Sequence, residues 1–239
     1  MQLFAKLSGL ALSWAPVSHP HTAAPPRCRD PKASLLVEQV EFHYKRMDHL
    51  TAQTAAVTPG LGCPPGCGAC CTSPTVEATE VELLPMAAML VREGRAQEAL
   101  SKLEQAEAQN DPLCVMFERI SPDGRLGRCS AYEHRPGICR LMGFSGRISA
   151  DGTAEWCPCK VMRESTDDAA QALAKPPPKE MPIISHELSK LRSTSGYASE
   201  QAPLLINDAL KRALSKELMR TMYSDLQSDD KALEDSNQP

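Results

Sequence analysis

Aromatic side chains are scarce in this chain of 239 residues: phenylalanine, tryptophan and tyrosine together make up 4% of it. A large core rich in aromatic rings is therefore not expected, and another feature has to supplement core packing. The obvious candidates are the ten cysteines. The remaining composition is ordinary for a globular protein, with 42% hydrophobic and 23% charged residues.

The chain also lacks an excess of positive charge. Its 26 basic and 30 acidic residues give a formal net charge of -4. Proteins that bind nucleic acid or anionic membranes normally carry a basic patch, so we expect neither kind of partner. No apolar run is long enough to span a bilayer. The apolar stretch near the N-terminus only weakly resembles a signal peptide, because polar residues and Pro16 interrupt it, so we expect a cytoplasmic protein.

Several catalytic motifs are missing from the sequence as well. It contains no glycine-rich phosphate loop, no GxSxG elbow and no HExxH motif. It also lacks the glycine fingerprint of a Rossmann-type nucleotide site. These absences argue against an autonomous methylase or dehydrogenase, and the sequence identifies no catalytic residue.

The sequence predicts an α+β fold that is mainly helical, with a small β-hairpin and irregular ligand loops in a metal-stabilised cysteine-cluster domain. Four segments are expected: a flexible tail at 1–32, the cysteine-cluster domain at 33–165, a Pro-rich linker at 166–202, and an amphipathic helix with a polar tail at 203–239. Helices are expected at about 33–57, 79–94 and 95–108, and the hairpin turn at 121–124. The spacing Thr79-x-x-Glu82 indicates a capping box.

The C-terminal helix has apolar residues at helical spacing from Leu205 to Leu226. We expect this face to pack back onto the domain or onto a second copy. Docking of a protein partner is the alternative, and the sequence does not fix the oligomeric state.

Four cysteines fall within the nine residues CPPGCGACC, at positions 63 to 71. A disulfide framework requires an oxidising compartment, which the interrupted apolar stretch near the N-terminus does little to support. Adjacent cysteines are also poor material for local bridges. Burial as small reduced side chains suits one or two cysteines, such as Cys28, but not a loop rich in glycine and proline. Metal ligation fits best, because zinc or an iron–sulfur cluster takes up to four thiolates.

Adjacent cysteines point in different directions, so Cys70 and Cys71 are expected to serve two centres or a shared cluster. Eight thiolates could form two four-sulfur sites. The eight predicted ligands are Cys63, Cys67, Cys70, Cys71, Cys114, Cys129, Cys139 and Cys157.

This cysteine pattern resembles the YkgJ-type cysteine-cluster family, a zinc- or iron-chelating domain with a CxxCxxCC signature. The resemblance covers about residues 35–162. Its motifs are C-x3-C-x2-CC, then Cys114, then GRCSAYEHRPGICR, then a late cysteine. Cys157 matches that late position, and Cys159 is the less certain match. The long helical insert between Cys71 and Cys114 departs from the bare pattern.

The resemblance implies that eight cysteines bind zinc or an iron–sulfur centre, and it leaves the choice of metal open. The metal would be structural or redox-active. Two alternatives are an iron–sulfur enzyme acting on a protein substrate, as an oxidoreductase or a lysine N-methylase, and a metal-handling or interaction protein.

Arginines surround the last part of the motif. Arg135 and Arg140 flank Cys139, where they would compensate thiolate charge, bind an anion, pair with Glu133 or Glu118, or simply be solvated. For Arg128, next to Cys129, pairing with a carboxylate or solvation is favoured.

Overall fold

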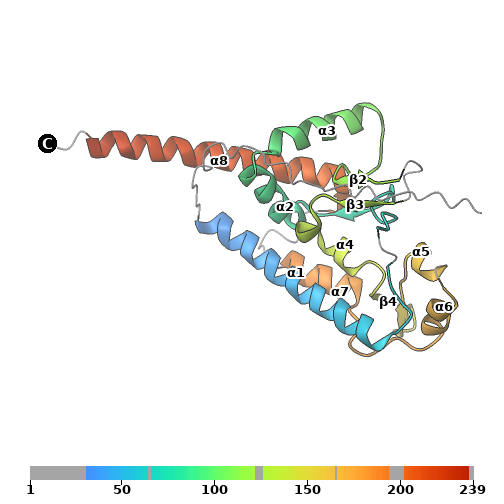
Figure 1. Ribbon diagram of the computed structural model, residues 1–239. Helices are drawn as coiled ribbons and strands as arrows, with labels where there is room; N and C mark the ends of the chain where they lie inside the picture. The colour runs from blue at the N-terminus through green and yellow to red at the C-terminus, as the bar shows by residue number, and fades with distance from the viewer. Residues whose placement is uncertain (1–30, 64–65, 122–125, 165, 194–201, 237–239) are drawn as a thin grey trace, which may run out of the picture.

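The computed structural model describes residues 31–63, 66–121, 126–164, 166–193 and 202–236 (Figure 1). The predicted tail therefore lies almost entirely outside the described residues. Within these ranges the α-helices are α1 (Pro31–Val57), α2 (Glu80–Arg92), α3 (Ala96–Ala108), α4 (Gly137–Leu141), α5 (Lys160–Arg163), α6 (Asp167–Leu173), α7 (Ile184–Ser193) and α8 (Ile206–Ser236). The structure confirms a mainly helical chain.

Strands are short and occur as three antiparallel pairs among the described residues. They are β1 (Glu77–Ala78) with β6 (Leu204–Leu205), β2 (Phe117–Arg119) with β3 (Gly127–Cys129), and β4 (Gly146–Ile148) with β5 (Ala154–Trp156). The β2–β3 pair is the hairpin that the sequence predicts. The β4–β5 hairpin was not expected as a strand pair, because three-residue strands are too short to show an alternating pattern.

Helix α2 begins as the sequence predicts. The Thr79 hydroxyl accepts a hydrogen bond from the Glu82 amide, and the Glu82 carboxylate accepts one from the Thr79 amide at 3.1 Å. This reciprocal capping box satisfies two amides that the first helical turn leaves without partners. The helix ends before Gly94, whose φ of 71° is the left-handed conformation that suits glycine.

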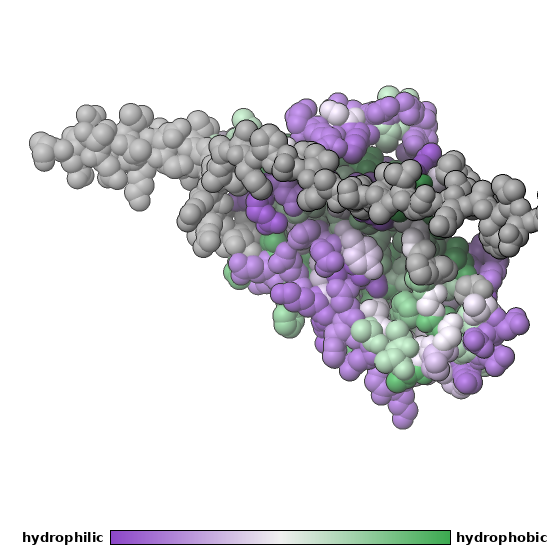
Figure 2. Space-filling view, viewed as in Figure 1, coloured by the Kyte–Doolittle hydropathy of each residue, from purple (hydrophilic) through white to green (hydrophobic). Residues whose placement is uncertain are grey.

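The main core lies between α2 and α8, with α3 against its edge (Figure 1). From α8 this core buries Ala209, Leu210, Ala213 and Leu214. The apolar face of the C-terminal helix thus packs back onto the domain, and the first part of α8 is a structural element of it. Figure 2 shows mainly hydrophilic residues over α3 and along α1, as expected for helices with one face in water. Within the described ranges, no helix has the length and apolar character needed to cross a bilayer.

A second core forms where α1 meets α4 and α7. It buries Val40, Tyr44 and Met47 of α1 against Leu188 and Leu191 of α7. The segment 166–202, which was expected to be a Pro-rich linker, therefore holds two helices, and α7 packs into this core. The proline run at 176–178 occupies only a short stretch between those helices, so a Pro-rich linker is a poor description of the segment. The domain boundaries themselves stay a prediction.

Candidate metal centre

Main-chain hydrogen bonds tie the cysteine loop to the β2–β3 hairpin. The Gly127 amide donates to the Gly66 carbonyl at 2.9 Å, and Cys67 forms an isolated bridge with Leu126. The Cys114 amide donates to the Cys71 carbonyl at 3.2 Å. These contacts bring together cysteines that are about forty or more residues apart in the sequence, as the composite site predicted from the sequence requires.

The cysteine loop turns sharply within itself. The amides of Cys71 and Thr72 both donate to the Gly68 carbonyl, at 2.9 and 3.1 Å. Gly66 has a φ of 70°, in the region where a side chain would be strained. This turn folds the loop back on itself, so that thiols on both sides of it face the same cavity.

A cavity of about 600 Å³ opens where the loop, the hairpin, α4 and the start of α5 meet. Eight cysteines line it: Cys63, Cys67, Cys70, Cys71, Cys114, Cys129, Cys139 and Cys159. Seven of these are ligands predicted from the sequence. Asp48, Arg135, Arg140 and Ile206 also contribute to its walls.

The eighth cavity thiol is Cys159, whereas the sequence prediction selected Cys157. Cys157 directly follows β5, and its amide donates to the Ser145 carbonyl at 3.0 Å. Cys159 is the N-cap of α5, where its sulfur accepts a hydrogen bond from the Met162 amide at 3.4 Å. Only one residue separates the two, and spacing alone could not show which faces the cavity. Ligation by Cys157 stays a prediction.

The adjacent cysteines have opposite electrostatic environments. A hydrogen bond from the Cys71 thiol, followed by main-chain amides and the Arg135 charge, lowers the pKa of Cys70 to about 6. Donating that hydrogen bond raises the pKa of Cys71, as do burial and the neighbouring Cys70, Cys114 and Cys129. Of this adjacent pair, Cys70 is therefore the one that more readily becomes a thiolate.

Other cavity thiols are held in the neutral form. Burial raises the pKa of Cys63 and of Cys114 to about 12 in each case. Burial also raises the pKa of Cys139, and the thiols of Cys70 and Cys114 raise it further. Thiols this close together cannot all ionise unless a cation offsets their repulsion, so the donor set fits a thiophilic metal ion.

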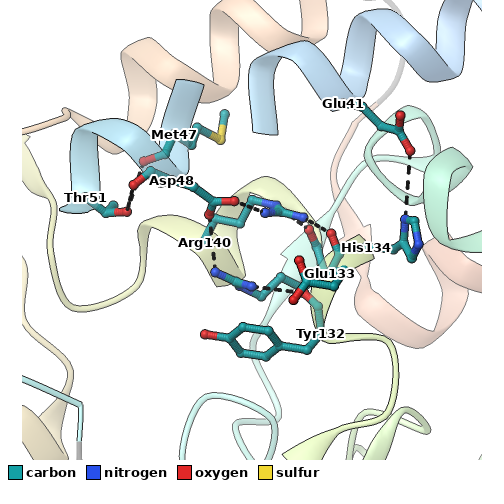
Figure 3. Close-up of polar contacts among 9 residues, drawn as sticks. Glu41, Met47, Asp48, Thr51, Tyr132, Glu133, His134 and Arg140 are labelled. Carbon is teal, nitrogen blue, oxygen red and sulfur yellow. Dashed lines mark hydrogen bonds and ion pairs between the residues drawn. The ribbon is translucent and has the colours of Figure 1, made fainter. Parts of the chain in front are cut away.

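The described thiols do not form a closed ligand cage on their own. No group of three or more histidine, cysteine, aspartate or glutamate side chains in the described ranges is arranged to hold a metal ion. The nine cysteines of those ranges are free, so no disulfide joins them. Cys28 lies outside the described residues. His134 Nδ1 lies 3.9 Å from Glu41 Oε1 (Figure 3). His134 does not line the cavity.

The two arginines of the HRPGICR stretch converge on one carboxylate of α1. Arg140 forms an ion pair with Asp48 (Figure 3). Arg135 Nη2 lies 3.2 Å from the other oxygen of the same carboxylate. Arg140 also donates to the main-chain carbonyls of Arg135 and Glu133. Neither arginine uses the Glu133 or Glu118 carboxylate considered from the sequence. Asp48 was not among the residues predicted from the sequence, although it lies one helical turn after Tyr44.

Aromatic rings complete the environment of these arginines. The Arg135 guanidinium carbon lies 3.8 Å from the centroid of the Tyr132 ring. Arg140 lies 4.3 Å from the Tyr44 centroid, and the Tyr44 hydroxyl donates to the Glu82 carbonyl. These contacts hold both cations beside the thiol cavity. Arg128 pairs with Glu118 at 2.7 Å on the surface, as expected.

A comparison with known protein families finds a match over the cysteine-rich part of the chain. Residues 62–164 match the model of a family described as "CxxCxxCC: Putative zinc- or iron-chelating domain". The resemblance to a zinc- or iron-chelating cysteine-cluster family is thereby confirmed for this stretch. No curated protein and no solved structure matches the chain.

Proposed function

We propose that this protein chelates zinc or iron in a composite centre built from the eight cavity thiols, with Cys159 as the eighth ligand. One observation carries the proposal: eight free thiols from the loop, the hairpin and the helices around them line one cavity. The family described for residues 62–164 points to the same two metals. Zinc and iron both bind thiolate ligands, and a bound ion would offset the electrostatic repulsion among the thiolates.

The arginines support this proposal through their charge. Four thiolates around Zn²⁺ leave a net charge of about −2, which nearby cations stabilise. Arg135 lowers the pKa of Cys70 and lies in the cavity wall with Arg140. Because Asp48 pairs with both arginines, it fixes their positions and offsets only part of their charge.

The role that the geometry favours is a structural cross-link. The ligands come from separate segments, and the strand pairs and main-chain hydrogen bonds between these segments are short and few. A metal bound by thiols from all these segments would contribute its binding free energy to folding. If the ion is iron, the same thiols would also support electron transfer.

The test is elemental analysis of the full chain prepared without oxygen, for the parent and two single variants. We expect at least one metal ion per chain in the parent. Cys159→Ser should lower the metal content, whereas Cys157→Ser, two residues away, should keep it. Less than one metal per chain in the parent would overturn the proposed function, and metal loss in Cys157→Ser alone would restore Cys157 as the ligand.

A further inference from the structure

The first turn of α8 reaches the cysteine cavity from outside the stretch 62–164. Ile206 forms part of the cavity wall and is buried. The next residue, Asn207, uses both groups of its side-chain amide on the main chain around Cys114. Its Nδ2 donates to the Leu113 carbonyl at 2.8 Å, and its Oδ1 accepts from the Val115 amide at 3.1 Å. A carbonyl on one side and an amide on the other fix the orientation of the Asn207 amide.

These two bonds complete the immobilisation of Cys114. Its own amide donates to the Cys71 carbonyl at 3.2 Å, and its carbonyl accepts from the Phe117 amide at 2.9 Å. The peptide groups on both sides of this cysteine are thus hydrogen-bonded to fixed partners. A side chain on a main chain held in this way has little freedom to turn away from the cavity.

Capping of α8 itself is the ordinary role of an asparagine at the start of a helix. Here neither side-chain group is used for that purpose, since both bond to residues more than ninety positions away. The start of α8 is held by other contacts. The Ile206 amide donates to the Val76 carbonyl at 3.0 Å, and β6 pairs with β1 immediately before the helix.

We infer that Asn207 is a positioning residue for the ligand Cys114, and that the metal site therefore extends into α8. The inference rests on the proposed function. Residues that orient a ligand without touching the metal typically contribute 10- to 100-fold to metal affinity, and Asn207 has the geometry of such a residue. The C-terminal helix is then part of the chelating unit rather than an appendage.

The experiment measures Zn²⁺ affinity by competition with a chromophoric chelator on the full chain. Asn207→Ala removes both hydrogen bonds and should weaken Zn²⁺ binding about 10- to 100-fold. Asn207→Asp keeps an acceptor for Val115 but faces the Leu113 carbonyl with a carboxylate, so it should also weaken binding. Asp208→Asn is the matched control, because Asp208 is exposed in the same turn and makes neither of these hydrogen bonds, and its affinity should stay within about twofold. Unchanged affinity in both Asn207 variants would overturn the inference.

A general stabilising role is separated by repeating the comparison in a Cys114→Ala background. If Asn207 acts through Cys114, Asn207→Ala should change the residual Zn²⁺ affinity by less than about twofold there. A full effect in that background would make Asn207 a brace of the fold and overturn its role as a positioning residue.

Amide hydrogen exchange tests the hydrogen bond between Asn207 and Val115 without depending on bound metal. The Val115 amide should exchange slowly in the parent and faster in Asn207→Ala, while α2 amides stay protected. Fast exchange of the Val115 amide in the parent would contradict the hydrogen bond to Asn207 directly. If the parent binds neither zinc nor iron but the Val115 amide is protected, the proposed function fails while the two Asn207 hydrogen bonds stand.

Discussion

The main chain of Gly68 lies against the ring of Phe117, so close that a Cβ on Gly68 would stand 2.2 Å from Cε2. Gly127 flanks the same ring, with a Cβ position 2.1 Å from the same atom. The ring therefore packs between the cysteine loop and β3, which carries Cys129. This contact holds the two halves of the thiol cavity together without using any of the thiols.

The first prediction is that Gly68→Ala separates those halves. The added methyl group overlaps the ring, and overpacking of this kind costs about 1–3 kcal/mol. Metal content should fall as well, because the loop carries four of the cavity thiols. Gly62→Ala is the control, since a Cβ there meets nothing within 4 Å. Denaturant unfolding and elemental analysis measure both effects, and equal behaviour of the two variants would contradict this account.

The second prediction compares two arginines that neighbour ligands. The side chain of Arg140 is 3% exposed and bonds to Asp48 and two carbonyls. Arg140→Met should therefore lower the free energy of unfolding by about 1.5–3 kcal/mol. Arg128→Met breaks only a surface pair with Glu118 and should cost less than about 1 kcal/mol. Urea unfolding midpoints give the comparison. Similar losses of stability in the two variants would mean that the ion pairs of Asp48 with Arg135 and Arg140 do not stabilise the fold.

The third prediction concerns Glu187 of α7 and pH. Burial alone would raise its pKa, but hydrogen bonds from Arg46 and Lys190 outweigh burial and lower it. The unfolded chain then binds a proton more readily, so stability rises with pH across this range. The stabilisation of the fold by ionised Glu187 is fully present above the pKa of the unfolded chain, about 4.3. It is lost as the pH falls through the pKa of Glu187 in the folded chain.

Glu187→Gln should therefore be less stable than the parent at neutral pH, and the difference should shrink in acid. Exposed Glu104→Gln provides the control and should follow the parent throughout. A difference for Glu187→Gln that is independent of pH would show that its charge does not hold α7 against α1.

The fourth prediction concerns α8. A chain ending at residue 205 loses the α8 side chains that pack against α2 in the main core, so it should lose both its helical circular dichroism and its metal. A chain ending at Tyr223 keeps Ala209, Leu210 and the other α8 side chains that the structure describes as buried, and it should fold. If the shorter chain keeps its fold and metal, α8 is a separate unit.

Much of this arrangement is present in the sequence because it is local. The Thr79–Glu82 capping box, the stop at Gly94 and the apolar face of α8 each depend on spacings of three or four residues. The helices in 166–202 were missed because the prolines at 176–178 dominate the composition of that segment. Its apolar spacing at Leu188 and Leu191 was the available signal.

The site was predictable as a set of cysteines but not as a geometry. Seven of the eight cavity thiols follow from the motif spacing. The choice between Cys157 and Cys159 depends on where β5 ends and α5 begins, a boundary that spacing does not determine. Asp48 and Asn207 act through contacts with residues about ninety positions away, and no local pattern records such contacts.

The most direct test of the central claim is X-ray absorption at the metal edge of the full chain prepared without oxygen. The account predicts a first shell of sulfur alone, at about 2.3 Å for zinc. A first shell dominated by nitrogen or oxygen, or the absence of stoichiometric zinc and iron, would contradict chelation by the cavity thiols.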